Sequence, residues 1–378
     1  MENIIVIIPI VIIIGIFSSK WDKWAPKKLE YKRYWDKDRV FVGDEIKMTT
    51  EITNRKFLML PWIEVNTVVP KELNFKDQKV IEYNHNSNKI YKVVTSLLSF
   101  QRVRVHNTIY CDKRGYYELH EVNTSIGSYL GQVAKKRFLS PIKILVYPKV
   151  KPLKDMIIPY KNYQGDISVK RWIIPDPTLI AGAREYNSSD SFNTIDWKTT
   201  ARMDKLYVKK FDFTGNPSVM AFLNVQTYES EIYGVKKEYI EKGIEIVAAI
   251  ANEANKDKIP MGYTSNGLFA GNNQNIFLKP SSSRNQFNFI LEALAKTNEY
   301  KRVGIAEEIK NKIKYINEGS VIVLVTAYLS ENVKKEINYL SRKGYIVKLI
   351  LLNDNTNIKG IHKNVEVLAS NDKSLMEG

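Results

Sequence analysis

The densest group of residues that could do chemistry lies in one stretch, AREYNSSDSFNTIDWKTTAR, at positions 183–202. Its ionisable and aromatic side chains are Arg184, Glu185, Tyr186, Asp190, Asp196, Trp197, Lys198 and Arg202. Carboxylates beside cations can form an acid–base pair or an anion clamp, and they can also form an ion-pair network that pins a connecting segment onto a neighbouring sheet. Because the stretch supplies no activated nucleophile and no metal cage, we interpret it as such a structural network.

Other sequence signals exclude several classes of protein. The chain lacks a Walker loop, a glycine-rich dinucleotide fingerprint and a G-x-S-x-G nucleophile elbow, and the GYTSNG at 262–267 fits an ordinary hairpin turn better. A single cysteine, Cys111, rules out an internal disulfide and a thiolate-built metal site. Lysine and arginine number 57 against 41 acids, a net charge of +16, which favours an anionic partner or membrane leaflet. The lysines are spread thinly, so we do not expect nucleic-acid binding.

The amino terminus carries an uncharged, isoleucine-rich run at residues 4–17, followed by Trp21 and Trp24. We predict a transmembrane anchor over residues 1–19, although the run is short for a bilayer core of about 30 Å. A cleaved signal peptide would need a basic segment before the run, and a buried core helix would need a polar face. Basic residues dominate positions 20–33. The positive-inside bias therefore predicts a single-pass protein of the cell membrane with the bulk of the chain in the cytoplasm.

The rest of the chain divides by periodicity into an α+β multidomain protein. Alternating residues rich in Val, Ile, Thr and Tyr predict an antiparallel, Ig-like β-sandwich at 28–150. Residues 151–213 have sparse periodicity and form a connecting segment, within which Asp196 is placed to cap a short helix. Apolar strands alternate with amphipathic helices over 214–378, which predicts a doubly wound α/β domain.

The polar stretch resembles the signature of domain-of-unknown-function family number fifty-eight. That family has Arg-Glu-Tyr, then Gly-Asp, then Ile-Asp-Trp-Lys and Ala-Arg, and this chain has Arg184-Glu185-Tyr186, Asp190, Ile195-Asp196-Trp197-Lys198 and Ala201-Arg202. It departs at Ser189 and Asn193, where the family has Gly and Arg. The stretches VFVGDEIKMTTEITNRKFLMLPWIEV, CDKRGYYEL and VYPKV resemble the family's sandwich domain, so the likeness covers most of the chain.

The resemblance implies that the α/β domain is similar to a von Willebrand factor type A (vWA) domain. Such domains often bind a divalent metal through an Asp-x-Ser-x-Ser loop after the first buried strand and an Asp after a later strand. This chain has Asn224, Gln226 and Tyr228 in the loop, and Thr326 followed by Ala327 at the later strand. Both carboxylates are missing, so we expect a degenerate site without a metal, in which Asn224 and Thr326 could still lie side by side.

We therefore expect a membrane-anchored cytoplasmic scaffold without cofactor or catalytic residue. Its α/β domain would dock a partner protein, and the resemblance implies a MoxR-type AAA ATPase. The alternative is a membrane-associated hydrolase using Glu185, Asp190 and Asp196, which requires two of these carboxylates to converge in a cleft about 5–10 Å apart.

Overall fold

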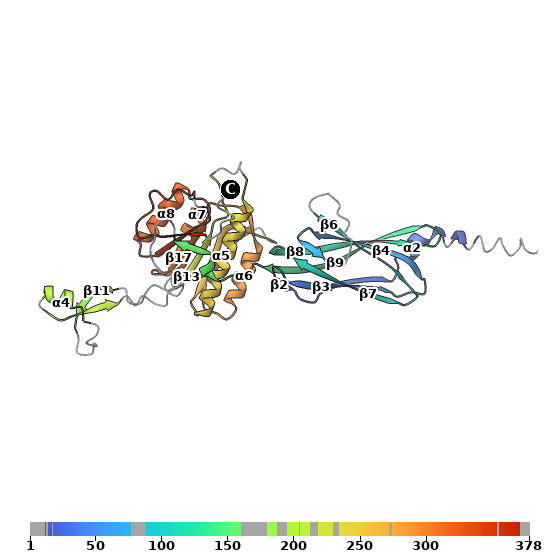
Figure 1. Ribbon diagram of the computed structural model, residues 1–378. Coiled ribbons are helices and arrows are strands. Elements are labelled where there is room, and N and C mark those ends of the chain that lie inside the picture. The colour runs from blue at the N-terminus through green and yellow to red at the C-terminus, as the bar shows by residue number, and fades with distance from the viewer. Residues whose placement is uncertain are drawn as a thin grey trace, which may run out of the picture. The chain divides into compact units, whose positions relative to one another are not determined.

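The computed structural model describes residues 12, 14–16, 18–76, 88–159, 180–186, 195–203, 205–211, 218–229, 234–271, 274–353 and 355–370 (Figure 1). The chain forms two compact units, Met1–Pro148 and Lys149–Gly378, which are described here separately.

The first unit is built from two β-sheets. The four-stranded sheet has the order β1-β3-β7-β5 and the five-stranded sheet the order β2-β9-β8-β4-β6. Neighbouring strands are antiparallel except β2 and β9, which are parallel. The bounds are β1 Leu29–Trp35, β2 Arg39–Phe41, β3 Glu45–Asn54, β4 Leu60–Pro70, β5 Leu73–Phe75, β6 Asn88–Leu97, β7 Arg102–Cys111, β8 Gly115–Gly127 and β9 Val133–Tyr147.

Both sheets contribute alternate side chains to one hydrophobic core. Ile46 and Met48 from β3 share it with Val65 from β4 and Val122 from β8, and all four are almost fully buried. Such period-2 burial is what the alternating sequence predicts, because successive strand side chains point to opposite faces. The β-rich amino-terminal region expected from the sequence is therefore confirmed.

A short helix, α2 (Trp21–Trp24), lies at one end of this unit, and β2 lies at the other (Figure 1). Within the described part of the chain, no helix is both long enough and apolar enough to cross a membrane. Residues 1–11, 13 and 17 of the predicted anchor lie outside the described residues.

The second unit contains a mixed sheet of eight strands with the main order β10-β19-β18-β17-β13-β14-β15, and β16 also pairs with β14. Strands β13, β14, β17, β18 and β19 are parallel, while β10, β15 and β16 are antiparallel to their neighbours. Counted from β13 along the main order, with β16 left out, the strands follow the 3-2-1-4-5-6 order of a doubly wound sheet. The strand bounds are β10 Ile157–Pro159, β13 Val219–Leu223, β14 Met261–Phe269, β15 Asn275–Ser281, β16 Thr297–Lys301, β17 Val321–Thr326, β18 Ile346–Leu351 and β19 Glu366–Ser370.

Helices cover both faces of this sheet, with α7 and α8 on one side of β13 and β17 and α5 and α6 on the other (Figure 1). Met220 and Phe222 from β13 pack with the first helix pair. Gly243 of α5 meets the opposite face, where an added Cβ would lie 2.7 Å from the Leu223 side chain. The bounds are α5 Lys237–Lys256, α6 Gln286–Lys296, α7 Ile305–Lys312 and α8 Glu331–Arg342. The mixed α/β architecture expected from the sequence is confirmed.

Candidate functional site

The signature segment forms a small motif of its own. Strands β11 (Ile180–Glu185) and β12 (Tyr207–Phe211) pair antiparallel, and helix α4 (Trp197–Met203) lies between them in the chain. Arg184 pairs with Val208 in this ladder, and the Tyr186 N–H donates to the Leu206 carbonyl at 2.8 Å. Asp190 lies outside the described residues.

Asp196 caps helix α4. Its carboxylate accepts hydrogen bonds from the Lys198 and Thr199 N–H groups at 3.2 Å and from the Thr199 hydroxyl at 2.9 Å. An N-cap carboxylate satisfies helix N–H groups that would otherwise lack a partner. The capping role expected from the sequence is therefore seen in the structure.

Glu185, the other described carboxylate of the signature, pairs with the exposed Lys205 at 3.3 Å. The side chains of Trp197, Lys198 and Arg202 are exposed. The contacts of Glu185 and Asp196 given above lie within the motif, so both serve its local structure. No observation among them favours the hydrolase alternative.

A second group of polar residues lies where β13 and β17 end. These strands are parallel neighbours. The chain continues from β13 to β14 on one side and from β17 to β18 on the other, so the pair forms the topological switch point of the sheet. In open α/β sheets, ligands bind at the carboxyl ends of the strands at such a point. Asn224 directly follows β13 and Thr326 ends β17, so the sequence order alone brings both to this place.

Asn224 and Thr326 are joined directly. The Asn224 side-chain N–H donates to Thr326 Oγ1 at 2.9 Å and to the Tyr328 carbonyl at 3.3 Å. The Thr326 hydroxyl donates to the same carbonyl at 2.7 Å. Both side chains are buried, with at most 2% exposed. The two positions expected to be neighbours are thus in hydrogen-bond contact.

The oxygen of the Asn224 side chain is also engaged. It accepts from the Gln226 N–H at 3.1 Å and from the Asn266 side chain at 3.0 Å. Asn266 in turn accepts from the Val225 N–H at 2.9 Å. We call Asn224, Asn266 and Thr326 the amide network. It satisfies its buried polar groups with one another, so it is stable without any charge.

The rim of this place is formed by the segment after Asn224 and the segment after Thr326. The Gln226 side chain donates to the Tyr228 carbonyl at 2.8 Å, which closes the first segment into a turn. Ala327 is buried and its carbonyl accepts from Thr356 at 3.0 Å. Burial raises the pKa of the Tyr328 phenol, and the nearby carboxylates of Glu229 and Glu331 raise it further. The rim is therefore polar and weakly acidic.

The residues of the amide network do not fit the divalent metal that the vWA resemblance implies. A hard cation needs several oxygen ligands, with carboxylates supplying the charge. Here the Asn224 oxygen already accepts two hydrogen bonds, and the Thr326 hydroxyl is directed at a carbonyl. Among the residues that the structure describes, no group of three His, Cys, Asp or Glu side chains could hold a metal.

Asn266 was missed by sequence reasoning, and the hairpin-turn interpretation of GYTSNG is wrong. Residues 262–267 lie inside β14, and Thr264, Ser265 and Asn266 are fully buried. Gly262 and Gly267 are the sequence feature that could have indicated a strand here. An added Cβ on Gly262 would lie 2.6 Å from the Leu278 carbonyl, and one on Gly267 would lie 2.6 Å from the Asn298 carbonyl. They are required by close strand packing and not by a turn.

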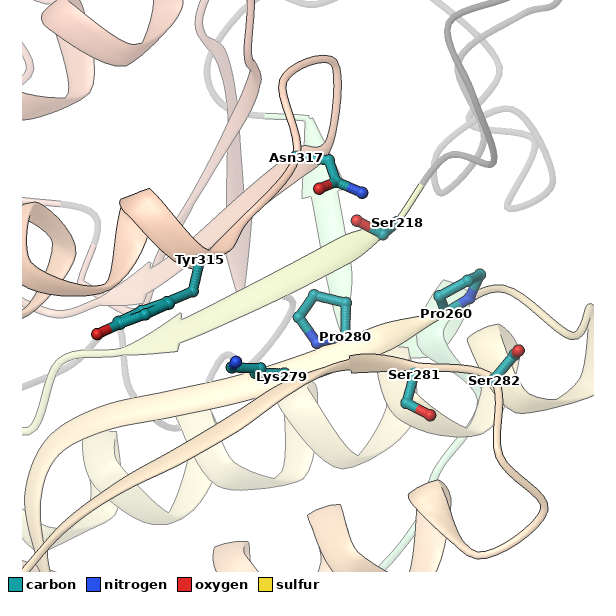
Figure 2. Close-up of a pocket in the computed structure, with 8 residues that line it drawn as sticks. All are labelled: Ser218, Pro260, Lys279, Pro280, Ser281, Ser282, Tyr315 and Asn317. Carbon is teal, nitrogen blue, oxygen red and sulfur yellow. The ribbon is translucent and has the colours of Figure 1, made fainter.

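A polar cavity of about 410 Å³ lies at the opposite, amino ends of β13 and β14 (Figure 2). Its lining residues are Ser218, Pro260, Lys279, Pro280, Ser281, Ser282, Tyr315 and Asn317. The Lys279 ammonium lies 5.1 Å from the centre of the Tyr315 ring. The buried Ser218 hydroxyl is hydrogen-bonded to the Ser320 hydroxyl at 2.7 Å, and no His, Asp or Glu lines the cavity to activate it. The cavity therefore offers no nucleophile–base pair.

Among solved structures, the matches are weak. The CARDB domain of a Pyrococcus furiosus protein, solved in complex with di-metal ions, is 13% identical, covers 31% of this chain and 91% of its own, and has a TM-score of 0.19. A non-cellulosomal cohesin from Archaeoglobus fulgidus is 12% identical, covers 32% and 91%, and has a TM-score of 0.22. Scores this low do not establish a shared fold.

Matches by sequence are more informative. The uncharacterized protein YeaD of Bacillus subtilis is 20% identical over 277 residues, which cover 71% of this chain. The match spans 62% of YeaD, less than two thirds of its length. The family model described as "Protein of unknown function DUF58" matches residues 182–357, which include most of β11 and all of α4, the amide network and β18. Over these residues the chain thus matches DUF58, the family that its signature resembles, and it is a distant homologue of YeaD.

Proposed function

We propose that this protein is a membrane-anchored cytoplasmic scaffold that docks a partner protein through a vWA-like α/β domain. The observation that carries the proposal is the amide network. It occupies the switch point, the usual ligand position of such sheets, with Asn224 and Thr326 hydrogen-bonded at 2.9 Å and no charged group among its members. A place built in this way supplies no acid, base or nucleophile for a reaction, so recognition falls to the exposed rim above it.

The rim supplies the recognition features. Tyr328 is partly exposed, and the Glu229 and Glu331 side chains lie close enough to affect its ionisation. Tyrosine is enriched in interface hot spots because it combines a large apolar ring with a hydroxyl. The two carboxylates favour a partner with a basic docking element. We propose a MoxR-type AAA ATPase as this partner, which is suggested by the resemblance to proteins commonly encoded beside such ATPases.

Membrane attachment is proposed from the apolar run at residues 4–17 and the basic residues that follow it. The bias of cationic residues to the cytoplasmic side of a span supports a cytoplasmic location for the two compact units. In this arrangement the signature motif, with its Asp196 cap, holds its own shape between β10 and β13 of the α/β sheet in the sequence.

The test is capture of the MoxR-type ATPase by the full-length chain from solubilised membranes, with and without nucleotide. Glu229→Arg reverses one charge on the rim and should reduce capture at least fivefold. Glu318→Arg makes the same change at an exposed position that follows Asn317 of the cavity lining and precedes β17 in the chain, and should leave capture unchanged. Failure of the wild-type chain to enrich the ATPase, or equal loss in both variants, would contradict the proposal.

A further inference from the structure

The end of the sandwich that carries α2 displays large apolar side chains on three loops, at residues 55–59, 98–101 and 128–132. Phe57 is 81% exposed, Phe100 is 68% exposed and Tyr129 is 84% exposed. Further exposed apolar side chains on these loops are Met59, Leu98 and Leu130. Single exposed apolar residues need no explanation, but such a group on neighbouring loops marks an interaction surface.

Two of these loops are fixed to each other. Asn54 is fully buried, and its side-chain N–H groups donate to the Leu58 and Leu98 carbonyls, each at 2.9 Å. The Phe100 N–H donates to the Lys56 carbonyl at 3.2 Å, and Phe100 has a φ of 54°. A non-glycine residue in this left-handed region is strained and persists only where its surroundings impose it. These hydrogen bonds fix the backbone of both loops in a conformation that leaves the Phe57 and Phe100 side chains exposed.

The amino-terminal segment enters the unit at the same end. The buried Trp21 indole donates to the Ile126 carbonyl at 3.0 Å, near the end of β8. The Lys136 ammonium donates to the carbonyls of Pro26 and Leu29 at 2.9 and 3.0 Å. Gln132 of the third loop is hydrogen-bonded to Ser18. The apolar run of residues 4–17 therefore joins the folded unit directly beside these loops.

The charges around the loops complement an anionic surface. The lysines within and beside α2 are exposed: Lys20, Lys23, Lys27 and Lys28. The nearby Arg55 is paired with Glu30 at 2.8 Å. Apolar and aromatic side chains ringed by lysines are typical of surfaces that enter the headgroup region of anionic bilayers.

We propose that the α2 end of the sandwich is a second membrane contact, in which Phe57, Phe100 and Tyr129 insert into the interfacial region of an anionic bilayer. The proposal rests on the membrane location proposed above and extends it. The anchor ties the chain to the bilayer, and the three loops fix the direction in which the sandwich stands on it. The lysines within and beside α2 then pair with lipid headgroup phosphates.

The test places an environment-sensitive fluorophore on single introduced cysteines of the full-length chain. Cys111 is buried, and burial raises the pKa of its thiol to about 12, so it does not compete for the label. Phe57→Cys and Tyr129→Cys probe the loops. Asp38→Cys is the matched control, since it is exposed and lies beside β2 at the opposite end of the sandwich.

The labelled chains are reconstituted into vesicles of phosphatidylcholine, with or without roughly 30% phosphatidylglycerol. The anionic lipid gives the vesicles a negative surface potential, like that of a cytoplasmic leaflet. At positions 57 and 129 we expect a blue-shifted emission and at least threefold quenching by spin-labelled lipid, stronger with phosphatidylglycerol. Position 38 should keep the emission of a probe in water.

The outcomes separate the two proposals. If the chain does not float with the vesicles, the membrane location fails and this inference fails with it. If the chain floats but positions 57 and 129 match position 38, the anchor holds and the second contact is refuted. A blue shift in detergent that grows with protein concentration would assign the loops to a second copy of the chain and would also refute the inference.

Discussion

Replacing Asn224 with aspartate tests the amide network, because the change is nearly isosteric and converts a donor into a charged acceptor. The Asn224 N–H groups donate to Thr326 Oγ1 and to the Tyr328 carbonyl, at 2.9 and 3.3 Å. In Asn224→Asp the second contact becomes oxygen against oxygen, and the new charge is buried. Leaving a buried polar group without its partner costs about 1–3 kcal/mol, and an unpaired buried charge raises the total to about 3–5 kcal/mol.

The assay is hydrogen exchange of the β13 and β17 amides in the full-length chain, with thermal unfolding as a second measure. At neutral pH we expect faster exchange across both strands, since the local opening free energy falls by the same amount. Magnesium is then added at 10 mM, roughly tenfold above the Kd of about 1 mM for a weak site. It should restore less than about 0.5 kcal/mol of the lost opening free energy.

Asn357→Asp is the matched control. Asn357 is exposed, and its side-chain oxygen accepts from the Lys359 N–H at 3.0 Å, a role that aspartate keeps. This variant should change stability by less than about 0.5 kcal/mol. An Asn224→Asp chain as stable as the wild type in the absence of magnesium would refute the interpretation of this place as a charge-free network.

Three further predictions follow from single residues. Asp196→Ala should speed exchange of the Lys198 and Thr199 amides, because loss of an N-cap costs about 0.5–2 kcal/mol, and Asp196→Asn should restore most of the protection. Burial, and the neighbouring Lys136, lower the pKa of Lys56 to about 8. The unfolded chain therefore binds more protons between about pH 8 and the ordinary lysine pKa of 10.5, so stability should rise with pH across that window. Lys56→Met should remove this dependence of stability on pH and stabilise the chain at pH 7 by about 1 kcal/mol, a figure reduced for partial solvent screening. Denaturant titration at pH 7 and pH 10 measures both effects. An unchanged pH dependence would contradict its assignment to Lys56. The Cys111 thiol should react with maleimide only as fast as the sandwich opens, so labelling in native buffer within minutes would show that its burial is incomplete.

Local patterns predicted most of the fold. The alternating residues of β4, IEVNTVV, predict a strand buried on one face, and the apolar run of β17, VIVLVT, predicts a strand buried on both faces. Each strand forms where its pattern lies. The α7 helix was missed because it is short and has only Ile305 and Ile309 as fully apolar buried positions. Strand β16 was missed because it begins directly at Thr297, where α6 ends.

The site was predictable only in part, for a physical reason. Asn224 and Thr326 each follow a recognisable buried strand, so the order of elements was enough to place them together. Asn266 completes the network from within β14, and its role depends on the register of β14 against β13, in which Leu223 lies opposite Ser265. A pairing between residues so far apart in the chain leaves no local pattern. The same holds for the three loops at the α2 end, whose proximity follows from the pairing of β3, β4, β7 and β8.

The central claim is that the switch point of the α/β sheet holds a buried, charge-free amide network under a weakly acidic rim and is not a metal centre. Titration of the full-length chain with Mn²⁺, followed by electron paramagnetic resonance, tests it most directly. We predict no site tighter than about 1 mM, because the amide network offers no carboxylate to the ion. A tighter Mn²⁺ site that is lost in Thr326→Val would contradict the claim.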